Sequence, residues 1–286
     1  MSTSTITAIP ARVRRERANA TGALSALATL TRRRLVLNAR TPRELVVPLM
    51  TPVLFALVIA PALASIGPTI PGLDYMSFAA VGTIGLLIPL NCMFSGIGVI
   101  VDRETGARRD LLAAPVSRPL IVLANLAVAL LTTALQVGVL IVAALLRGAD
   151  LSTSPTGLVW FLGAALLLGI AMYGVAETVS NRIPSVEEYT GVLPGIAIVP
   201  FFFAGSLFPI TALPSALAGF ARVLPLTHAL ALMRYGLLND NASGLHDIWG
   251  MSNATLMAGL SLAVVVAYAG LFSALALRTF RKSVES

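Results

Sequence analysis

Charged residues gather in one stretch of this 286-residue chain, from residue 102 to residue 118. The runs on either side, 75–101 and 119–146, carry no charged residue. Because about 20 apolar helical residues cross a hydrocarbon core of roughly 30 Å, each run is long enough to span a membrane. The charged stretch is therefore predicted to be a loop outside the bilayer, and its arginines favour the cytoplasmic side. Its seven charged residues are Asp102, Arg103, Glu104, Arg108, Arg109, Asp110 and Arg118.

This loop is longer than a simple reversal of the chain requires, and it has residues suited to internal order. Gly106 permits a tight bend. Asp110 can cap a short helix that carries Leu111 and Leu112, and Pro115 would end that helix. The two leucines would give the helix an apolar side for a partner protein. A solvated loop, held in the cytoplasm by its arginines, explains the charges equally well.

Two motifs in this sequence resemble those of a known family. The string R-E-x-G-x-x-x-x-L-L-x-x-P-V-S-R, from Arg103 to Arg118, is similar to the first cytoplasmic loop of type-two ABC exporter permeases. The segment F-P-I-T-A-L-P at 208–214, followed by L-P-L-T-H and by Arg234, resembles the segment that precedes the last span in this family. Together with the pattern of spans, the resemblance covers most of residues 21–280.

The resemblance implies a permease subunit that works with a separate ABC ATPase. In that family the loop carries a coupling helix that docks on the ATPase, so ATP and Mg²⁺ are expected on the partner and no cofactor on this chain. One copy would supply half of a translocation pathway, which implies a homodimer of permeases with two ATPase subunits. The implied docking residues are Arg103, Glu104, Gly106, Leu111, Leu112, Pro115 and Arg118.

The composition is that of a membrane protein. Hydrophobic residues make up 57% of the chain and charged residues 12%, whereas soluble domains carry about 25% charged residues. Most basic residues fall on the predicted cytoplasmic side, so the net charge of +7 indicates membrane topology and not nucleic-acid binding. The single cysteine, Cys92, excludes an internal disulfide, and two histidines give little basis for a metal site.

The hydropathy pattern predicts an all-α membrane protein with six transmembrane helices and both termini in the cytoplasm. Residues 1–20 are expected to be a disordered basic tail, and residues 21–286 a single transmembrane permease domain. A helix over 21–43 would lie on the membrane as an interfacial elbow, with a basic stop signal of no fixed structure as the alternative. The membrane is expected to be a bacterial plasma membrane, whose lipid is a further partner. The spans are expected at 46–66, 75–101, 119–146, 156–179, 189–206 and 251–277.

Between the fifth and sixth spans, residues 208–240 contain prolines and apolar runs too short to cross a membrane. Short outer re-entrant helices that govern release are predicted here, with helices starting after Pro214 and Pro225. A seventh span over 212–238 is the alternative, but it would bury Arg222 at a cost of about 2.5–3.5 kcal/mol. The apolar residues expected to pack against the spans are Leu213, Leu217, Phe220, Leu224 and Leu226. The predicted outer gate is Phe208, Pro209, Leu213, Pro214 and Pro225.

Motifs for catalysis are absent from this sequence, which contains no G-x-x-x-x-G-K-[ST], H-E-x-x-H or G-x-S-x-G pattern. The chain is therefore not expected to be an enzyme. Glu177 is expected to reach toward the inner interface beside Arg182, and a functional charge inside the membrane is the alternative. The middles of the predicted spans lack carboxylates, which argues against an ion-coupled secondary transporter, kept as the alternative function. A channel or a scaffold without transport activity is less favoured.

The expected function is ATP-driven export of a hydrophobic or amphiphilic compound, a drug-like molecule or a lipid, as in multidrug efflux. The scarcity of charges at membrane depth favours such a cargo. The second and fifth spans are predicted to line its path, although an aromatic triplet in a span also suits contact with lipid or a neighbouring helix. Successive helical residues are about 100° apart, so only part of that triplet can face the path. The path residues are Asn91, Met93, Phe94, Ser95, Phe201, Phe202 and Phe203.

Overall fold

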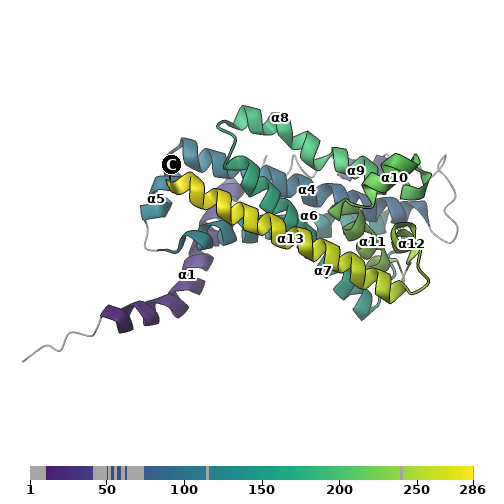
Figure 1. Ribbon diagram of the computed structural model, residues 1–286, viewed down its shortest axis with the longest axis horizontal. Helices are drawn as coiled ribbons and strands as arrows, with labels where there is room; N and C mark the ends of the chain where they lie inside the picture. Colours follow the sequence, from purple (N-terminus) through teal and green to yellow (C-terminus); the bar gives the residue numbers. More distant parts are fainter. Residues whose placement is uncertain are drawn as a thin grey trace, which may run out of the picture.

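A computed structural model describes residues 11–40, 50, 53–54, 57–58, 62, 74–113, 116–238 and 241–285. Within these residues every regular element is a helix, and several long helices run along the molecule's longest axis (Figure 1). Five of the described helical segments are long and apolar enough to cross a membrane. They are α4 (Tyr75–Glu104), α6 (Arg118–Leu146), α7 (Pro155–Ser180), the pair α8 (Val186–Ala197) and α9 (Val199–Phe203), and α13 (Ala254–Glu285).

These segments confirm five predicted spans, and the first predicted span, 46–66, lies almost wholly outside the described residues. The observed boundaries differ from the predicted ones mainly where charged residues begin. α4 continues through the charged residues 102–104, and α13 extends past the predicted end at 277. The apolar run marks the part of a helix that hydrocarbon can cover, whereas backbone hydrogen bonding continues into the polar turns beyond it.

α7 lies at the centre of the bundle, where it packs against α4, α13 and α11 (Pro225–Leu237). Glycines allow the close approach of these helices. Gly174 lies against the backbone of Phe272 in α13, and Gly157 meets Gly236 of α11. A Cβ atom at any of these three glycines would overlap the neighbouring backbone. Small residues at such crossings are the usual means of packing helices within membranes, where apolar surface gains little from burial against other apolar surface.

The N-terminal helix α1 (Ala11–Arg40) packs against α6 and leaves the bundle at the end that holds α5 (Ala107–Ala113) and the C-terminus (Figure 1). It covers most of the elbow predicted over 21–43. It also includes residues 11–20, which were assigned to a disordered tail and are helical here. The position of α1 on a membrane surface stays a prediction.

The opposite end of the bundle is built from short helices: η2 (Ile210–Ala212), α10 (Ser215–Ala221), α11 and α12 (Ser243–Trp249). α10 and α11 meet at an angle of 77°, so residues 212–238 do not form a straight seventh span. Pro214 precedes α10 and Pro225 lies in the first turn of α11, as predicted. Proline suits these positions because the first turn of a helix leaves its N–H groups unbonded.

The predicted packing of these short helices is only partly right. Every residue of α11 after Pro225 is buried. In α10, however, Leu217 and Phe220 are 38% and 52% exposed. The residues that α10 buries are Ala218 and Ala221. With only seven residues, α10 has one narrow face for its neighbours, and these two alanines occupy that face.

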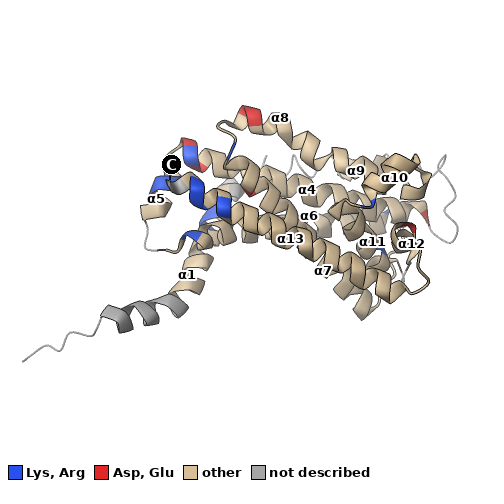
Figure 2. Cartoon of the chain, viewed as in Figure 1, with Lys and Arg blue, Asp and Glu red and all other residues tan. Residues whose placement is uncertain are grey.

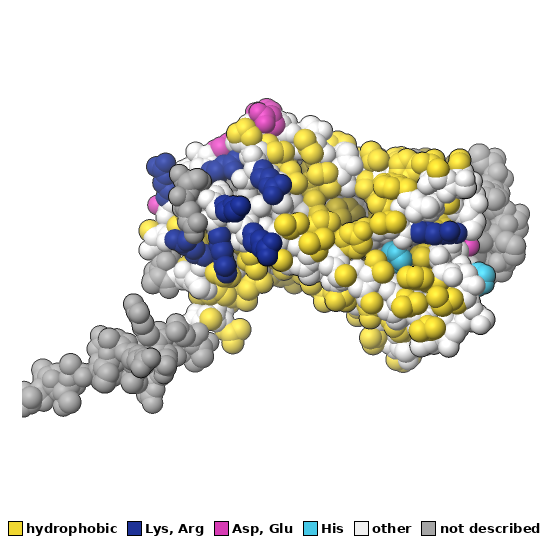
Figure 3. Space-filling model, in the orientation of Figure 1, with side chains coloured by type: hydrophobic (Ala, Val, Ile, Leu, Met, Phe, Trp, Pro, Cys, Tyr) yellow, Lys and Arg dark blue, Asp and Glu magenta, His cyan; other side chains and the backbone are white. Residues whose placement is uncertain are grey.

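Charge is distributed unevenly along the bundle. Figure 2 shows Lys and Arg mainly at the end with α5 and the C-terminus, and Figure 3 shows them clustered there on the face in view. Hydrophobic side chains cover much of the remaining surface in that view. This arrangement is the one that the basic loops and C-terminus predict, and which side of the membrane this end faces stays a prediction.

Candidate functional site

The predicted docking loop begins with the last turn of α4 and continues into α5. Gly106 makes the bend with a φ of +79°, a backbone conformation that L residues with a side chain rarely adopt. The prediction that Asp110 caps the short helix is wrong, because α5 already starts at Ala107 and contains Asp110. The bend itself supplies the first acceptor, since the Arg109 N–H donates to the Gly106 carbonyl oxygen. Pro115 lies outside the described residues.

The predicted pair of leucines, Leu111 and Leu112, does not form the exposed surface of the docking loop. Leu111 and Leu112 are partly buried and pack against the hydrophobic core. They take the inner side of the two-turn helix because burial of apolar area is favourable. A partner protein would therefore meet mainly charged groups. Among the described residues of 102–118, the exposed ones are Glu104, Thr105, Arg109, Asp110, Ala113, Ser117 and Arg118.

Arg103 contributes little to that surface, because its guanidinium group binds the chain itself. Nη1 donates to the Ser180 carbonyl oxygen over 3.1 Å. Nη2 donates to the carbonyl oxygens of Ile183, over 2.6 Å, and Pro184, over 2.9 Å. These acceptors lie at and beyond the end of α7, where helical carbonyls lose their partners. Arg103 thus fastens the corner between α4 and α5 to the turn between α7 and α8.

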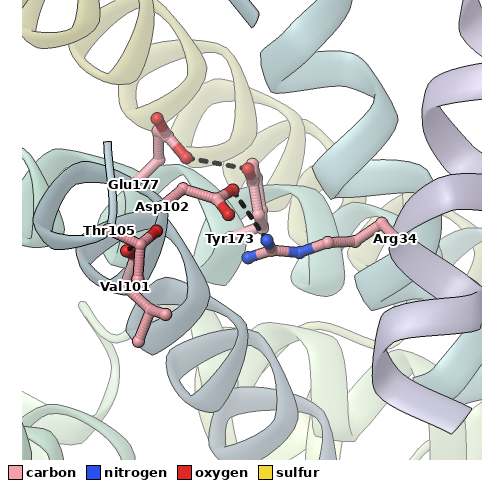
Figure 4. Close-up of polar contacts among 6 residues, drawn as sticks. All are labelled: Arg34, Val101, Asp102, Thr105, Tyr173 and Glu177. Atoms are coloured by element: carbon pink, nitrogen blue, oxygen red, sulfur yellow. Dashed lines mark hydrogen bonds and ion pairs between the residues drawn. The ribbon is translucent and has the colours of Figure 1, made fainter. Parts of the chain in front are cut away.

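An ion pair joins α1 to the same corner. Arg34 Nη1 of α1 lies 2.7 Å from Asp102 Oδ2 of α4 (Figure 4), and the two side chains are only 11% and 14% exposed. Gly98, one turn earlier on α4, makes room for this contact, because a Cβ atom there would overlap the Arg34 guanidinium group. A pair so sheltered from water is screened by salt much less than a surface pair.

Glu177 lies inside the bundle and is 1% exposed. Its carboxylate accepts a hydrogen bond from the Tyr173 hydroxyl over 2.8 Å (Figure 4). It accepts a second one from Asn181 Nδ2 over 2.9 Å. The prediction that Glu177 extends to the interface beside Arg182 is therefore wrong. Its two partners lie one turn away along the chain in either direction, so the carboxylate finds its hydrogen bonds within the bundle.

Arg108 connects α5 to α13, and its charge interacts with that of the buried Glu177 carboxylate. Its side chain is 9% exposed, and its guanidinium carbon lies 5.0 Å from the centre of the Phe280 ring. This is a cation–π distance. Burial lowers the pKa of Arg108, and the negative charge of Glu177 acts in the opposite direction. We refer to the following residues, which together connect α1, α4, α5, α7 and α13, as the inner cluster: Arg34, Asp102, Arg103, Arg108 and Glu177.

The predicted path residues of α4 lie mostly inside the bundle. Asn91 is buried, and its Nδ2 donates to Oε1 of Gln136 in α6. Met93 is fully buried, and its carbonyl oxygen accepts from the Tyr189 hydroxyl over 2.8 Å. Phe94 and Ser95 are partly buried. α4 therefore uses these polar groups to hold neighbouring helices.

The aromatic triplet of the fifth span is divided between the inside and the outside of the bundle. Phe201 is buried, Phe203 is partly buried and Phe202 is 49% exposed. This division matches the prediction that successive rings cannot share one face. α8 contacts α4, but the exposed Phe202 ring and the buried Asn91 amide do not share a surface.

The predicted outer gate lies at the surface between the fifth span and α11. Phe208, Pro209, Leu213 and Pro225 are partly buried, and Pro214 is exposed. Sequence reasoning gave no structural role to the residue that organises this end, Arg234, which was named only as part of the segment that resembles the family. Arg234 is 5% exposed and lies 3.5 Å from the centre of the Phe78 ring. A signal was present in the sequence, since Arg234 stands in an otherwise apolar helical stretch.

Comparison with known proteins identifies similar sequences. The model of the ABC-2 type transporter family matches residues 25–238. Nodulation protein J of Rhizobium meliloti (strain 1021) is 27% identical over 168 residues, which cover 58% of this chain and 63% of that protein. Nodulation protein J of Rhizobium leguminosarum bv. viciae is 26% identical over 195 residues, which cover 67% of this chain and 74% of that protein. The chain thus spans less than two thirds of the first relative and about three quarters of the second.

Proposed function

This chain belongs to the ABC-2 type transporter family, and we propose that it is the membrane subunit of an exporter driven by a separate ABC ATPase. The family consists of multi-pass membrane subunits that are not themselves catalytic. ATP and Mg²⁺ would bind to the partner, and this chain would bind no cofactor. In the proposed complex, a homodimer of this chain carries two ATPase subunits on the cytoplasmic side of the plasma membrane. Both termini of this chain then lie in the cytoplasm.

The observation that carries this proposal is the position of α5. The helix follows α4 directly, precedes α6, and exposes Arg109, Asp110 and Ala113 at the charged end of the bundle. A loop that only reversed the chain would need no helix with one buried and one exposed side. An exposed helix that is tied to several spans is suited to receive a push from a partner protein.

The inner cluster supplies contacts through which such a push can reach the spans. Arg108 connects α5 with Phe280 of α13, and Arg103 connects the end of α4 with the turn after α7. Leu111 and Leu112 pack against the core. Closure of the ATPase pair would shift α5 and favour one arrangement of these helices over another. Such coupling requires that the ATPase contact the two arrangements with different free energies.

We propose a hydrophobic or amphiphilic cargo, either a drug-like molecule or a lipid. The support is the apolar character of the spans and the half-exposed ring of Phe202 on the fifth span. The buried Glu177 lies at the charged end of α7 and already accepts two hydrogen bonds, so it offers little support for ion coupling.

Co-purification with an ABC ATPase tests the proposal. A candidate ABC ATPase from the same genome is expressed with this chain, and the exposed side of α5 is changed by Arg109→Glu together with Ala113→Asp. We expect normal insertion in the membrane and loss of the ATPase from the purified complex. Changes at Leu111 and Leu112 are less suitable, because their side chains also pack against the core.

A matched control places a charge reversal at the other end of the bundle. Arg147 is exposed just after α6, so Arg147→Glu should leave the complex intact. Unchanged assembly in the α5 variant would contradict the docking role of this helix. Transport that continues without the ATPase and stops when ion gradients are collapsed would identify an ion-coupled secondary transporter instead.

A further inference from the structure

A cavity of about 280 Å³ lies at the charged end of the bundle, between the start of α6 and the last turns of α13. Figure 2 shows that this end also holds α5. The buried Phe280 ring forms part of the wall, and both arginines of the wall are exposed. Pockets for drug-sized ligands begin at about 300 Å³, so this one suits a single headgroup. The wall consists of Arg118, Pro119, Leu277, Phe280 and Arg281.

The charge of this wall is positive. Among the described residues, no acidic side chain lines the cavity, and neither Arg118 nor Arg281 belongs to an ion pair. α6 starts at the cavity, and its N-terminus adds partial positive charge, because the Ser117 side chain makes no capping hydrogen bond there. Since both arginines are exposed, their N–H groups can reach a ligand in the cavity. The wall is therefore complementary to an anion.

Both arginines stand where a membrane span leaves the hydrocarbon. Arg118 directly precedes the uncharged run 119–146 of α6, and Arg281 lies one turn beyond Leu277, the last residue before the charged end of α13. Lipid headgroups occupy this level of a bilayer. The planar guanidinium group presents several N–H donors that match the oxygens of a phosphate, and basic pockets between membrane helices bind lipid headgroups in this way. The position therefore favours a lipid phosphate as the anion.

Apolar surface leads from the cavity toward the middle of the membrane. On α6, Leu123 lies one turn after Pro119 and is 46% exposed. On α13, small exposed residues continue the side of the helix that carries Arg281, because their spacings of three and four residues follow the helical turn. A Cβ atom at Gly270 would meet nothing within 4 Å, so this side of α13 is open. An acyl chain can lie here below a headgroup in the cavity. The small residues are Ala263, Ala267, Gly270 and Ala274.

We infer that this cavity binds the phosphate of an anionic phospholipid, such as phosphatidylglycerol. Inorganic phosphate or an acidic side chain of a partner protein would also suit the arginines, but neither would use the apolar surface below them. A zwitterionic lipid brings an ammonium group, which the two arginines repel. The bound lipid connects the start of α6 with the end of α13. It lies beside the predicted docking helix, because Phe280 of the wall also contacts Arg108 of α5.

Native mass spectrometry of the purified chain in detergent tests the inference, because it resolves bound lipids during a titration. The probe is dioleoyl phosphatidylglycerol, and the matched probe is dioleoyl phosphatidylcholine, which has the same acyl chains. We expect phosphatidylglycerol to bind about tenfold more tightly, and equal affinity for the two lipids would overturn the inference. The titration uses the chain without an ATPase, so its outcome is independent of the exporter function proposed above.

Three variants locate the binding in this cavity. Arg118→Gln and Arg281→Gln should each weaken phosphatidylglycerol binding about tenfold, the factor that corresponds to about 1.4 kcal/mol for one lost hydrogen bond to a charged group. Arg278→Gln is the matched control, because Arg278 is exposed near Arg281 on α13 and is not part of the cavity wall. It removes the same charge and should bind the lipid like the parent. Equal weakening in all three variants would indicate a general attraction between charges and would overturn the site. Thermal unfolding checks that each variant folds like the parent, as expected for changes at exposed residues.

Two competitors distinguish a lipid from a soluble anion. Glycerophosphoglycerol carries the same headgroup without acyl chains, and neither it nor inorganic phosphate should displace the lipid at equal concentration. Displacement by either one would identify a site for a soluble anion and would overturn the inference. Co-expression with the ATPase gives the last comparison, in which Arg281→Gln should keep the ATPase and lose the lipid. Loss of the ATPase with parent-like lipid binding would instead assign the cavity to an acidic group of the partner protein.

Discussion

Gly98 of α4 lies directly against the guanidinium group of Arg34 in α1, and this arrangement lets Arg34 pass over α4 to reach Asp102. The absence of a side chain at residue 98 is thus the condition for an ion pair between two helices that are distant in the sequence. From the sequence alone Gly98 gives no sign of this contact, because it is a glycine within an apolar span. The contact makes the attachment of α1 to the bundle sensitive to one methyl group.

We expect Gly98→Ala to displace Arg34 and to break its contact with Asp102. The free energy of unfolding should fall by about 1.5–3 kcal/mol, the range for a hydrogen bond to a charged group. Thermal unfolding of the chain in nanodiscs measures this change. Gly138→Ala in α6 is the control, because a Cβ atom there meets nothing within 4 Å. A Gly98→Ala variant as stable as the control would show that the ion pair contributes nothing.

Two residues predicted to line the path, Asn91 and Phe202, have different surroundings, because Asn91 is buried and Phe202 is half-exposed. Asn91→Leu removes the donor to Gln136 and should lower the free energy of unfolding by about 1–2 kcal/mol.

Phe202→Ala removes a half-exposed ring and should change stability by less than about 1 kcal/mol. If the fifth span lines the path, Phe202→Ala alters the ATPase stimulation that cargo produces in the assembled complex. Val159→Ala, at an exposed position of α7, serves as the control, and parent-like stimulation in Phe202→Ala would exclude this role.

Cysteine accessibility tests which side of the membrane the short helices face. Ser215 and Ser243 are exposed, whereas the native Cys92 is fully buried, so Cys92→Ala gives a clean background. We expect Ser215→Cys and Ser243→Cys both to react with an impermeant thiol reagent in intact cells. Ser117→Cys, at the exposed start of α6, should react only after permeabilisation. Opposite behaviour of the two outer positions would mean that the segment crosses the membrane.

We expect the stability of the protein to depend on pH through the partly buried carboxyl group of Asp247. Burial raises the pKa of Asp247, and the smaller influence of His246, Arg234 and Arg222 opposes this effect. The group therefore contributes its full stability below the ordinary carboxyl pKa of about 4, and that contribution is lost as pH rises through the higher pKa of the folded state. We expect Asp247→Asn to unfold at a higher temperature than the parent near pH 7 and at the same temperature below about pH 4. A constant difference across this range would contradict the assignment.

The sequence by itself determined the class of the protein and the order of its elements. Long uncharged runs such as 119–146 are local signals, because a membrane span must satisfy its own backbone within a single helix. Pro214 and Pro225 are local signals too, since a missing N–H and a fixed φ decide where a helix starts whatever surrounds it. For the same reason the bend at Gly106 was predictable from one residue.

Only the tertiary structure decided what the polar side chains do. The acceptors of Arg103 lie 77 to 81 residues further along the chain, and Arg34 and Asp102 are separated by 68 residues. Which of these groups meet depends on the rotation and height of each helix in the bundle, and these are set by packing contacts such as those of Gly174 and Gly98. The short helix after Gly106 was predictable, but the burial of its leucines depended on the core beside it. Arg234 shows the same limit, because a guanidinium group in an apolar helix can be tolerated only where carbonyl groups from another part of the chain converge on it.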